Sequence, residues 1–281
     1  MKKEPDSVST IERLKSHFAT LDGVTVAFSG GVDSTVLLSV ACEVLGDRVL
    51  AVICHAPSHT AREIDEALTL AAQLGVETQL IHVDPLNDPG MQANDRRRCY
   101  HCKKVLFSTI MEAAAAAGLP TVVEGTNADD RGDYRPGFQA VRELGVRSPF
   151  YELDIGKTEI RRMAKARNLP VWNKPAAACL ISRLPYDTEI TEARLRRIEA
   201  AEETLRAADI WPARARDHGD LLRVETDPEL FTALLAPLRR TSLVAELKAL
   251  GYAFVAFDLE GYRTGAMNET LRHPKEDADV D

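Results

Sequence analysis

The sequence predicts an α/β protein in which a parallel-sheet domain is followed by a small α+β C-terminal domain. Two observations predict the first domain. Short apolar runs alternate with helix-length segments, and a glycine pair directly follows the first run. From Thr191 onward, charged helices and short strands predict the second domain. We expect the domains to cover residues 1–186 and 187–272, ahead of an acidic, disordered tail over 273–281.

Four runs are expected to form the strands of the parallel sheet, the first two of them buried. They cover residues 24–28, 49–54, 79–83 and 121–124. Helices are expected over 34–41, 60–74 and 157–167, while 84–98 and 169–186 are rich in proline and are expected to be irregular. Ligands of such sheets bind outside the carboxyl ends of the strands. The loops after the first and fourth runs are therefore the candidate binding site.

In the second domain, helices and strands are expected to alternate. A charged helix is predicted over 191–208, a strand over 221–225, a helical region over 228–250 and a strand over 252–259. These elements are enough for one small layer of sheet covered by helices.

The composition of the chain limits the kinds of partner that the protein is expected to bind. The chain of 281 residues is 45% apolar, which supports a sizeable core, and its net charge of −8 argues against a protein that binds bulk nucleic acid. The N-terminus is too polar for a signal peptide, and no apolar stretch is long enough to cross a bilayer. We therefore expect a cytoplasmic protein without a membrane partner. In a reducing compartment its 5 cysteines are expected to be free, catalytic or metal-bound.

The glycine pair belongs to a predicted phosphate-binding loop. The loop reads Ser29-Gly30-Gly31-Val32-Asp33-Ser34 and lies between the first strand and the helix that follows. Two glycines let several N–H groups turn toward one anion, and the start of the helix adds further N–H groups. The Gly-x-x-x-x-Gly-Lys-Ser/Thr loop is absent. An ordinary glycine turn is the alternative, but it would need neither the flanking hydroxyls nor Asp33.

Polar residues also follow the fourth apolar run. Thr126, Asn127 and Asp129 are expected at the neighbouring strand end, where they would contact a nucleotide or a metal ion. A helix-capping turn is the alternative interpretation.

Three cysteines form a further candidate site. Cys99 and Cys102 are a Cys-x-x-Cys pair, a pattern shared by zinc sites, iron–sulfur sites and redox pairs, and Cys179 lies in a later loop. A redox pair should open a helix beside a strand, whereas an Arg96-Arg97-Arg98 loop is expected to precede this pair. A zinc site needs four ligands, and only three cysteines lie in the candidate loops. Three thiolates can instead hold a four-iron cluster in which one iron has no protein ligand. Cys42 and Cys54 are expected to be buried hydrophobic residues.

Several motifs together resemble the LarE family of PP-loop ATP pyrophosphatases. They are the glycine loop, Asp95–Lys103, Gly125-Thr126-Asn127, Lys174–Arg183, Arg214–Gly219 and Asp258–Asn268, and they span roughly residues 10 to 270. The resemblance implies an adenine nucleotide alpha hydrolase-like fold for the first domain. It also implies an ATP-dependent sulfur transferase that acts on pyridinium-3,5-biscarboxylic acid mononucleotide during nickel-pincer nucleotide biosynthesis.

The resemblance implies a role for each matching residue. ATP would bind over Ser29–Ser34 with Mg²⁺ held by Asp33, and one substrate carboxylate would be adenylated with release of pyrophosphate. Cys179 would attack the acyl adenylate as a thiolate stabilised by Lys174 and Arg183. In family members with a single cysteine at this site, the sulfur of that cysteine is transferred to the substrate.

This chain matches the three-cysteine members, in which Cys99, Cys102 and Cys179 would hold a [4Fe-4S] cluster that passes on an added sulfur. Arg214 and Arg216 match positions that bind the substrate phosphate, with a solvated charged strand as the alternative. Glu202 and Glu225 would bind substrate or an interface metal, unless they are ordinary surface acids.

The family also implies a homo-oligomer, a trimer or a hexamer. A tRNA-thiolating PP-loop enzyme is the main rival interpretation, and it would need a basic face for RNA that the acidic composition does not favour. A regulator that has lost its chemistry is a second rival, against which the intact Ser29, Asp33, Ser34 and Cys179 argue.

Overall fold

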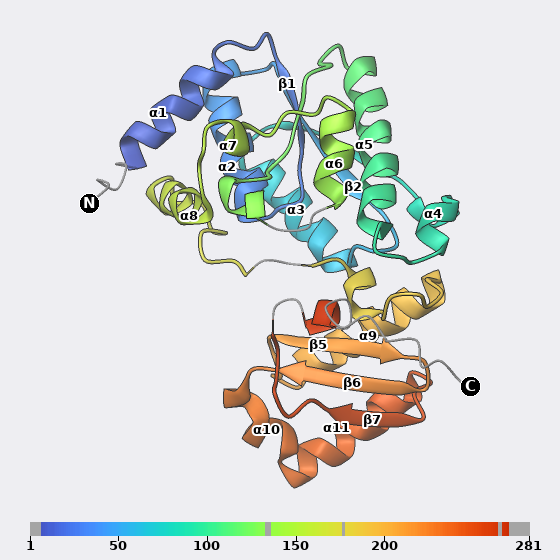
Figure 1. Ribbon diagram of the computed structural model, residues 1–281. Coiled ribbons are helices and arrows are strands. Elements are labelled where there is room, and N and C mark those ends of the chain that lie inside the picture. Colours follow the sequence, from blue (N-terminus) through green and yellow to red (C-terminus); the bar gives the residue numbers. More distant parts are fainter. Residues whose placement is uncertain (1–6, 133–135, 176–177, 264–265, 270–281) are drawn as a thin grey trace. The chain divides into compact units, whose positions relative to one another are not determined.

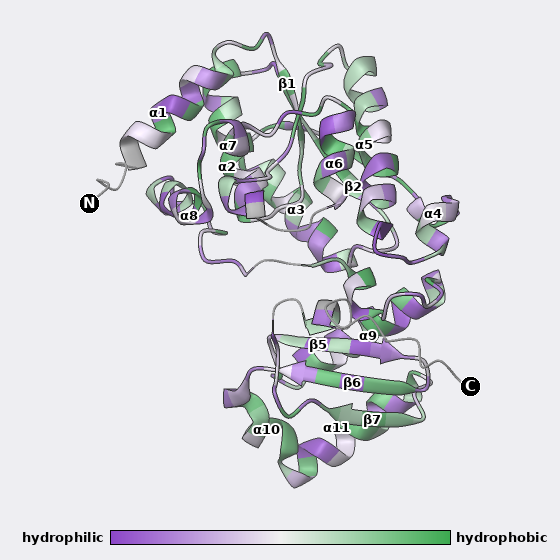
Figure 2. Ribbon diagram, in the orientation of Figure 1, coloured by the Kyte–Doolittle hydropathy of each residue, from purple (hydrophilic) through white to green (hydrophobic). Residues whose placement is uncertain are grey.

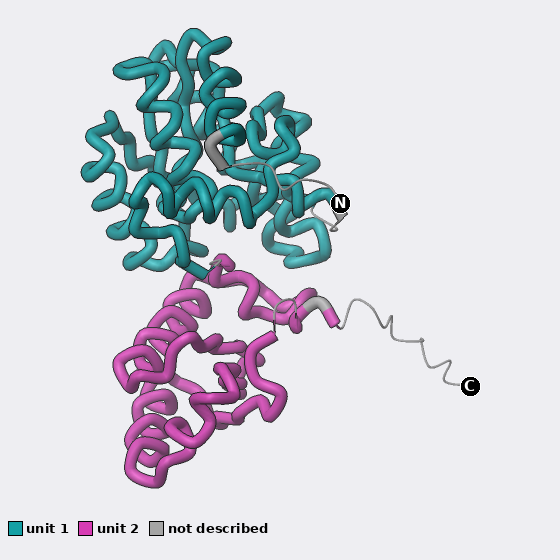
Figure 3. Tube along the Cα trace, turned by 90° about the vertical axis from the view of Figure 1, so that its left-hand side faces the viewer, with its two compact units in different colours: residues 1–177 teal, residues 178–281 magenta. Residues whose placement is uncertain are grey.

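The computed structural model describes residues 7–132, 136–175, 178–263 and 266–269. The chain divides into two compact units, residues 1–177 and 178–281 (Figure 3). The division falls before Cys179, whereas the sequence placed the boundary after residue 186. The difference arises because the turn after Cys179 is bonded to the helix of the second unit through Arg183 and Glu202. The predicted tail over 273–281 lies outside the described residues.

The first unit contains the predicted parallel sheet (Figure 1). Its strands within the described residues are β1 (Val24–Ala27), β2 (Val49–His55), β3 (Glu77–His82) and β4 (Val122–Val123), in the order β3-β2-β1-β4. All three pairings are parallel. Because the chain moves from β1 toward β3 and later returns to the other side of β1, a topological switch point lies between β1 and β4.

Helices cover both faces of this sheet, as the sequence predicted. They are α1 (Ser7–Phe18), α2 (Val32–Leu45), α3 (Ala61–Gln73), α4 (Pro89–Gln92), α5 (Arg98–Ala116), α6 (Pro136–Glu143), α7 (Pro149–Glu152) and α8 (Lys157–Ala166), with 3-10 turns at Pro85–Asn87 and Ala128–Gly132. Alternation along β2 separates the two cores: Val49 and Ala51 pack with α1, α2 and α8, whereas Leu50 and Val52 pack with α5 and α6.

The segment 84–98 is more regular than the sequence predicted. The side chains of Asp84 and Asp88 each cap a short helix that begins with proline, and α5 already begins at Arg98. The predicted loop therefore contains two short capped helices and the first residue of a long one.

The second unit packs helices against a small mixed sheet. It contains the 3-10 turn Leu180–Arg183, α9 (Glu192–Ala207), β5 (Ala213–His218), β6 (Leu221–Thr226), the turn Pro228–Leu230, α10 (Phe231–Leu235), α11 (Pro237–Ala249), β7 (Phe254–Phe257) and the turn Ala266–Asn268. Strand β5 runs antiparallel to β6, and β7 runs parallel to it. Apolar and hydrophilic residues alternate along α11 (Figure 2), and its Leu243 and Leu247 are buried. Among the described residues, no helix is both long and apolar enough to cross a membrane.

Candidate functional site

The glycine loop joins β1 to α2 at the switch point of the sheet. Gly30 has φ of 66°, and a β-carbon there would lie 3.0 Å from Ala67 of α3. The hydroxyls of Ser29 and Ser34 lie 3.2 Å apart. Gly31 is the N-cap of α2 and provides no side-chain cap, so the first N–H groups of the helix remain directed at the loop. This arrangement suits a bound anion.

Asp33 and Lys157 are paired beside this loop. Lys157 is the first residue of α8, and its ammonium group donates a hydrogen bond to Oδ2 of Asp33. Oδ1 of Asp33 is buried and has no hydrogen-bond partner among the residues that the structure describes. A buried carboxylate oxygen without a donor is costly, and a hard divalent cation such as Mg²⁺ would satisfy it.

Lys157 is brought to Asp33 by the turn that follows β4. Oδ2 of Asp129 accepts the backbone N–H of Lys157 at 2.7 Å, and the N–H of Asp129 donates to Oδ1 of Asn127 at 3.1 Å. Gly156 permits this contact, because a β-carbon there would lie 2.9 Å from Oδ1 of Asp129. Asp129 and Asn127 thus shape the site through the start of α8, and their predicted contact with a ligand stays a prediction.

Glu124 organises the same turn and was not predicted. Its buried carboxylate accepts hydrogen bonds from the N–H of Thr126 at 3.0 Å, the hydroxyl of Thr126 at 2.9 Å and the hydroxyl of Ser148. Next to it, Gly125 lies against the glycine loop, since a β-carbon at Gly125 would be 2.9 Å from Cβ of Asp33. The Gly-Thr-Asn motif therefore supplies a close contact between the two strand ends.

Lys174 also contacts the glycine loop. Its ammonium group donates to the carbonyl of Gly30 at 3.2 Å and to Oε2 of Glu66 at 2.9 Å. Partial burial alone would raise the pKa of Glu66, but hydrogen bonding to Lys174 and Arg62 and their charges lower it overall. Lys174 thus lies at the glycine loop as a cation paired with Glu66. Its predicted action on Cys179 stays a prediction.

The Cys-x-x-Cys pair lies at the start of α5. Cys99 is its second residue and is exposed, and Cys102 follows one turn later and is partly buried. The arginine loop expected before the pair ends at Arg97, so the pair does open a helix, and the argument that counted against a redox pair was wrong. None of the five cysteines forms a disulfide bond. Cys42 and Cys54 pack against the two cores of the first unit, as predicted, but are partly rather than fully buried. Burial raises the pKa of Cys42 and raises that of Cys54 to about 12.

Arg183 holds the backbone around Cys179 in the second unit. Its Nη1 donates to the carbonyls of Ala178 at 2.6 Å and Cys179 at 3.1 Å, while Nε and Nη2 donate to the two oxygens of Glu202 at 2.8 and 2.9 Å. Arg183 and Glu202 are both buried. Arg183 therefore fixes the position of the cysteine, and Glu202 is a buried partner rather than a surface acid.

Arg214 and Arg216 lie on one face of β5, as their spacing predicted. Both are buried, which excludes the solvated strand that the sequence left open. Arg216 donates to Oε2 of Glu225 at 2.7 Å, and Glu225 is completely buried. Arg214 has no carboxylate within salt-bridge distance among the described residues, and its guanidinium lies over the ring of Tyr262 at 4.8 Å. Burial and the charge of Arg183 lower the pKa of Arg214.

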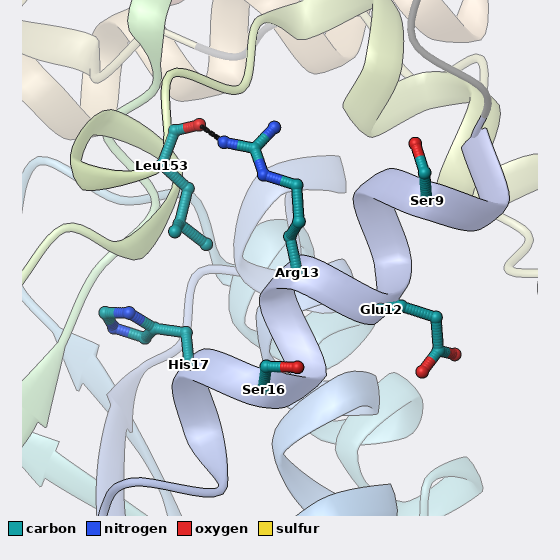
Figure 4. A pocket seen from close by; sticks show the side chains of 6 residues that line it. All are labelled: Ser9, Glu12, Arg13, Ser16, His17 and Leu153. Atoms are coloured by element: carbon teal, nitrogen blue, oxygen red, sulfur yellow. Dashed lines mark hydrogen bonds between the residues drawn. The ribbon is translucent and has the colours of Figure 1, made fainter.

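Of the predicted residues, the structure therefore brings Lys174 and the turn of Thr126, Asn127 and Asp129 to the glycine loop, with Lys157 and Glu124 as additions. Where residues are described, no three His, Cys, Asp or Glu side chains are placed to hold a metal ion together. A shallow hollow of about 560 Å³ lies beside α1, where Arg13 donates to the carbonyl of Leu153 at 2.5 Å (Figure 4). Its lining residues are Ser9, Glu12, Arg13, Ser16, His17 and Leu153, none of which is a predicted site residue.

Comparison with known proteins connects this geometry to a family. The NAD synthase family matches residues 8–104, which contain the glycine loop. An uncharacterized protein of Synechocystis is 39% identical over 94% of this chain and 98% of its own length. The pyridinium-3,5-bisthiocarboxylic acid mononucleotide synthase of Lactiplantibacillus plantarum is 38% identical over 89% of this chain and 91% of its own length.

A more distant relative matches a shorter part of the chain. The NH₃-dependent NAD⁺ synthetase of Pyrococcus horikoshii is 28% identical over 56% of this chain and 62% of its own length. The chain therefore belongs to the LarE family of PP-loop ATP pyrophosphatases and is an ATP-dependent enzyme.

Proposed function

We propose that the protein is a sulfur transferase that converts a carboxylate of pyridinium-3,5-biscarboxylic acid mononucleotide to a thiocarboxylate, for nickel-pincer nucleotide biosynthesis. The 38% identity with the mononucleotide synthase, which extends through both units, carries the proposal. Two local features of the described residues support it: Oδ1 of Asp33 beside the glycine loop has no hydrogen-bond partner among them, and the buried Arg214 has no carboxylate among them within salt-bridge distance.

The first half-reaction would use the site of the first unit. A substrate carboxylate oxygen attacks the α-phosphorus of ATP, the acyl adenylate forms, and pyrophosphate leaves. The N–H groups of Ser29–Ser34 would bind the departing phosphates, and the cations Lys157 and Lys174 would offset their charge. Asp33 would hold Mg²⁺ through its unpaired oxygen.

The second half-reaction would use Cys179. Its thiolate attacks the acyl carbon, AMP leaves, and a thioester forms. In the sacrificial route, the Cα proton of Cys179 is then removed and its Cβ–S bond breaks. This leaves the sulfur on the substrate as a thiocarboxylate and dehydroalanine in the protein. Arg183 would hold the segment in place, because it bonds the carbonyls on both sides of the cysteine Cα.

The alternative sulfur source is a [4Fe-4S] cluster held by Cys99, Cys102 and Cys179. Cys99 and Cys102 suit two corners of such a group, because residues three apart on a helix lie on the same face. When bound, the cluster would supply sulfide from an iron without a protein ligand. In that route Cys179 is a ligand, and the enzyme turns over repeatedly.

The identity of the reaction product tests the proposed function, and the chemical state of Cys179 after the reaction identifies the sulfur source. Anaerobically purified protein is mixed with ATP, Mg²⁺ and the pyridinium substrate, and small molecules and protein are analysed by mass spectrometry. We expect a product in which sulfur replaces one carboxylate oxygen. Thiolation of added tRNA, with no change of the pyridinium compound, would overturn the proposal in favour of the tRNA-thiolating alternative.

The same samples separate the two sulfur routes. A broad visible absorption band that is lost in Cys99→Ala would support the cluster. A colourless protein that loses the mass of hydrogen sulfide at Cys179 would establish the sacrificial route. The proposal places the enzyme in the reducing cytoplasm as a homo-oligomer, trimer or hexamer, which light scattering of the purified protein tests.

A further inference from the structure

The segment that leads to Cys179 is bonded to both α8 and the glycine loop. Arg161 of α8 donates from Nη1 to the carbonyl of Trp172 at 2.8 Å and from Nη2 to the carbonyl of Lys174 at 2.9 Å. The ammonium group of Lys174 donates to the carbonyl of Gly30 at 3.2 Å. Lys174 is therefore held through its main chain by α8 and through its side chain by the glycine loop.

Helix α8 is itself fixed beside the glycine loop. Its first residue, Lys157, pairs with Asp33 through its side chain and donates its backbone N–H to Asp129. The apolar side of α8 is buried in the core of the first unit. Arg161 follows Lys157 by four residues, so the two side chains lie on the same side of the helix. One face of α8 thus contacts both the glycine loop and the segment before Cys179.

The segment itself consists of turns. Within residues 169–174, two backbone hydrogen bonds of 3.2 and 3.0 Å close successive turns. Trp172 is 39% exposed, and its ring lies 4.9 Å from Nζ of Lys165. Exposed turns with little buried apolar surface open readily. Hydrogen bonds from a charged group are stronger than those between neutral groups, so the two bonds from Arg161 contribute much of the order of this segment.

We infer that Arg161 is a positioning residue for sulfur transfer, because it holds the segment from which Cys179 extends. The inference rests on the proposed function, in which the acyl adenylate forms at the glycine loop. Cys179 follows Lys174 by five residues, and an extended chain of this length spans at most about 18 Å. A fixed Lys174 therefore limits the positions that the cysteine can reach, and such restriction speeds a reaction between two groups.

Arg161 acts on the second half-reaction. In the sacrificial route, the thiolate of Cys179 bonds to the acyl carbon, the bond from that carbon to the AMP oxygen breaks, and AMP leaves with the electron pair. In the cluster route, Cys179 is a ligand of the group that carries the sulfur, so its position matters equally. Formation of the adenylate uses Asp33 and Lys157 instead, and their pairing does not involve the bonds that Arg161 makes.

Hydrogen exchange of the resting protein tests the anchor without any substrate. In Arg161→Gln, the N–H groups of Trp172 and Lys174 should exchange at least about tenfold faster than in the wild type, because two hydrogen bonds from a charged group are lost. Arg161→Lys can still bond one carbonyl and should show an intermediate rate. Arg162→Gln, the same substitution at an exposed neighbour on α8, is the control and should exchange like the wild type.

The rates of the two half-reactions test the role in sulfur transfer. In a single turnover with ATP, Mg²⁺ and the pyridinium substrate, Arg161→Gln should release pyrophosphate at nearly the wild-type rate but form thiocarboxylate at least about tenfold more slowly. Arg161→Lys should recover part of the second rate, and Arg162→Gln should keep both. A merely destabilised variant would slow both steps by the same factor, and that result would overturn the inference.

The inference and the proposed function fail in different ways. Unchanged exchange at Trp172 and Lys174 in folded Arg161→Gln would refute the inference and leave the sulfur-transfer proposal intact. If the wild type forms no thiocarboxylate, the proposed function fails, and the exchange rates alone decide whether Arg161 anchors the segment. Melting curves show which variants fold, and Arg161→Lys, which keeps the charge, carries the test if Arg161→Gln unfolds.

Discussion

The ammonium group of Lys157 donates to Oδ2 of Asp33, while Oδ1 of the same carboxylate is buried and lacks a partner among the described residues. The two residues are 124 positions apart in the sequence, and their contact brings the start of α8 to the start of α2. One oxygen of Asp33 is thus held in place by a protein cation, and the other would hold a metal ion under the proposed function. This division of roles is what a site for magnesium-bound phosphates needs.

Lys157→Ala tests the importance of this pair. Loss of the cation removes a fixed charge beside the departing phosphates and frees Asp33 to rotate, so the rate of ATP-dependent pyrophosphate release should fall by about 10²-fold. Lys165→Ala, an exposed lysine on the same helix, is the control and should keep the wild-type rate. Equal rates of pyrophosphate release for the two variants would show that Lys157 has no role in this reaction.

Gly30→Ala tests the shape of the glycine loop, with Gly75→Ala as its matched control. Both glycines have positive φ, 66° and 65°, so alanine strains the backbone at each position. The added methyl group meets nothing within 4 Å at Gly75, whereas at Gly30 it lies 3.0 Å from Ala67. In urea unfolding, Gly30→Ala should therefore lose more stability than the control variant. In an ATP-binding measurement, only Gly30→Ala should lose affinity.

Arg183→Lys tests whether Cys179 is positioned by its neighbour. Lysine keeps the charge but cannot bond both oxygens of Glu202 and two carbonyls at once. Sulfur transfer should slow at least about tenfold, while pyrophosphate release in the first unit stays near the wild-type rate. Arg196→Lys, a half-exposed arginine of α9, is the control. A parallel loss of both half-reactions would show a general folding defect.

Asp217 makes the stability of the second unit depend on pH. Burial alone would raise the pKa of Asp217, but hydrogen bonds from Arg194, Gly219 and Arg197 lower it overall. A lowered pKa contributes stability above the unfolded value of about 4, and this stability is lost as the pH falls below it.

Asp217→Asn should therefore lower the free energy of unfolding at pH 7 by about 3 kcal/mol or more, because two arginines lose a buried partner. Urea unfolding should show that the difference from the wild type shrinks in strongly acidic buffer. A difference that is independent of pH would contradict the assignment.

The strands of the sheet were predicted well where burial on both faces gives the sequence a continuous apolar run. The apolar strands β1 and β2 were found within one or two residues, because both faces of a covered parallel sheet require apolar side chains. The start of α5 was missed, since its N-cap Arg97 makes no side-chain cap and three arginines there indicate a loop. The partly exposed strand β3 also began two residues earlier than predicted.

The site was predictable only where its residues share a motif. Ser29 to Ser34 stand together in the sequence, so their common role was visible. Lys157 gave no such signal, because it reaches Asp33 only through the fold and through the turn at Asp129. Burial of Arg214 and Glu225 was equally hidden, since alternating charges on a strand usually indicate a solvated face.

Pyrophosphate release measures the central claim most directly. With ATP, Mg²⁺ and pyridinium-3,5-biscarboxylic acid mononucleotide, the wild-type protein should release pyrophosphate only when the pyridinium compound is present. Asp33→Asn, which keeps the shape of the side chain but removes its charge, should release almost none. Release at the same rate without the pyridinium compound, or undiminished release by Asp33→Asn, would contradict an acyl adenylation at the glycine loop.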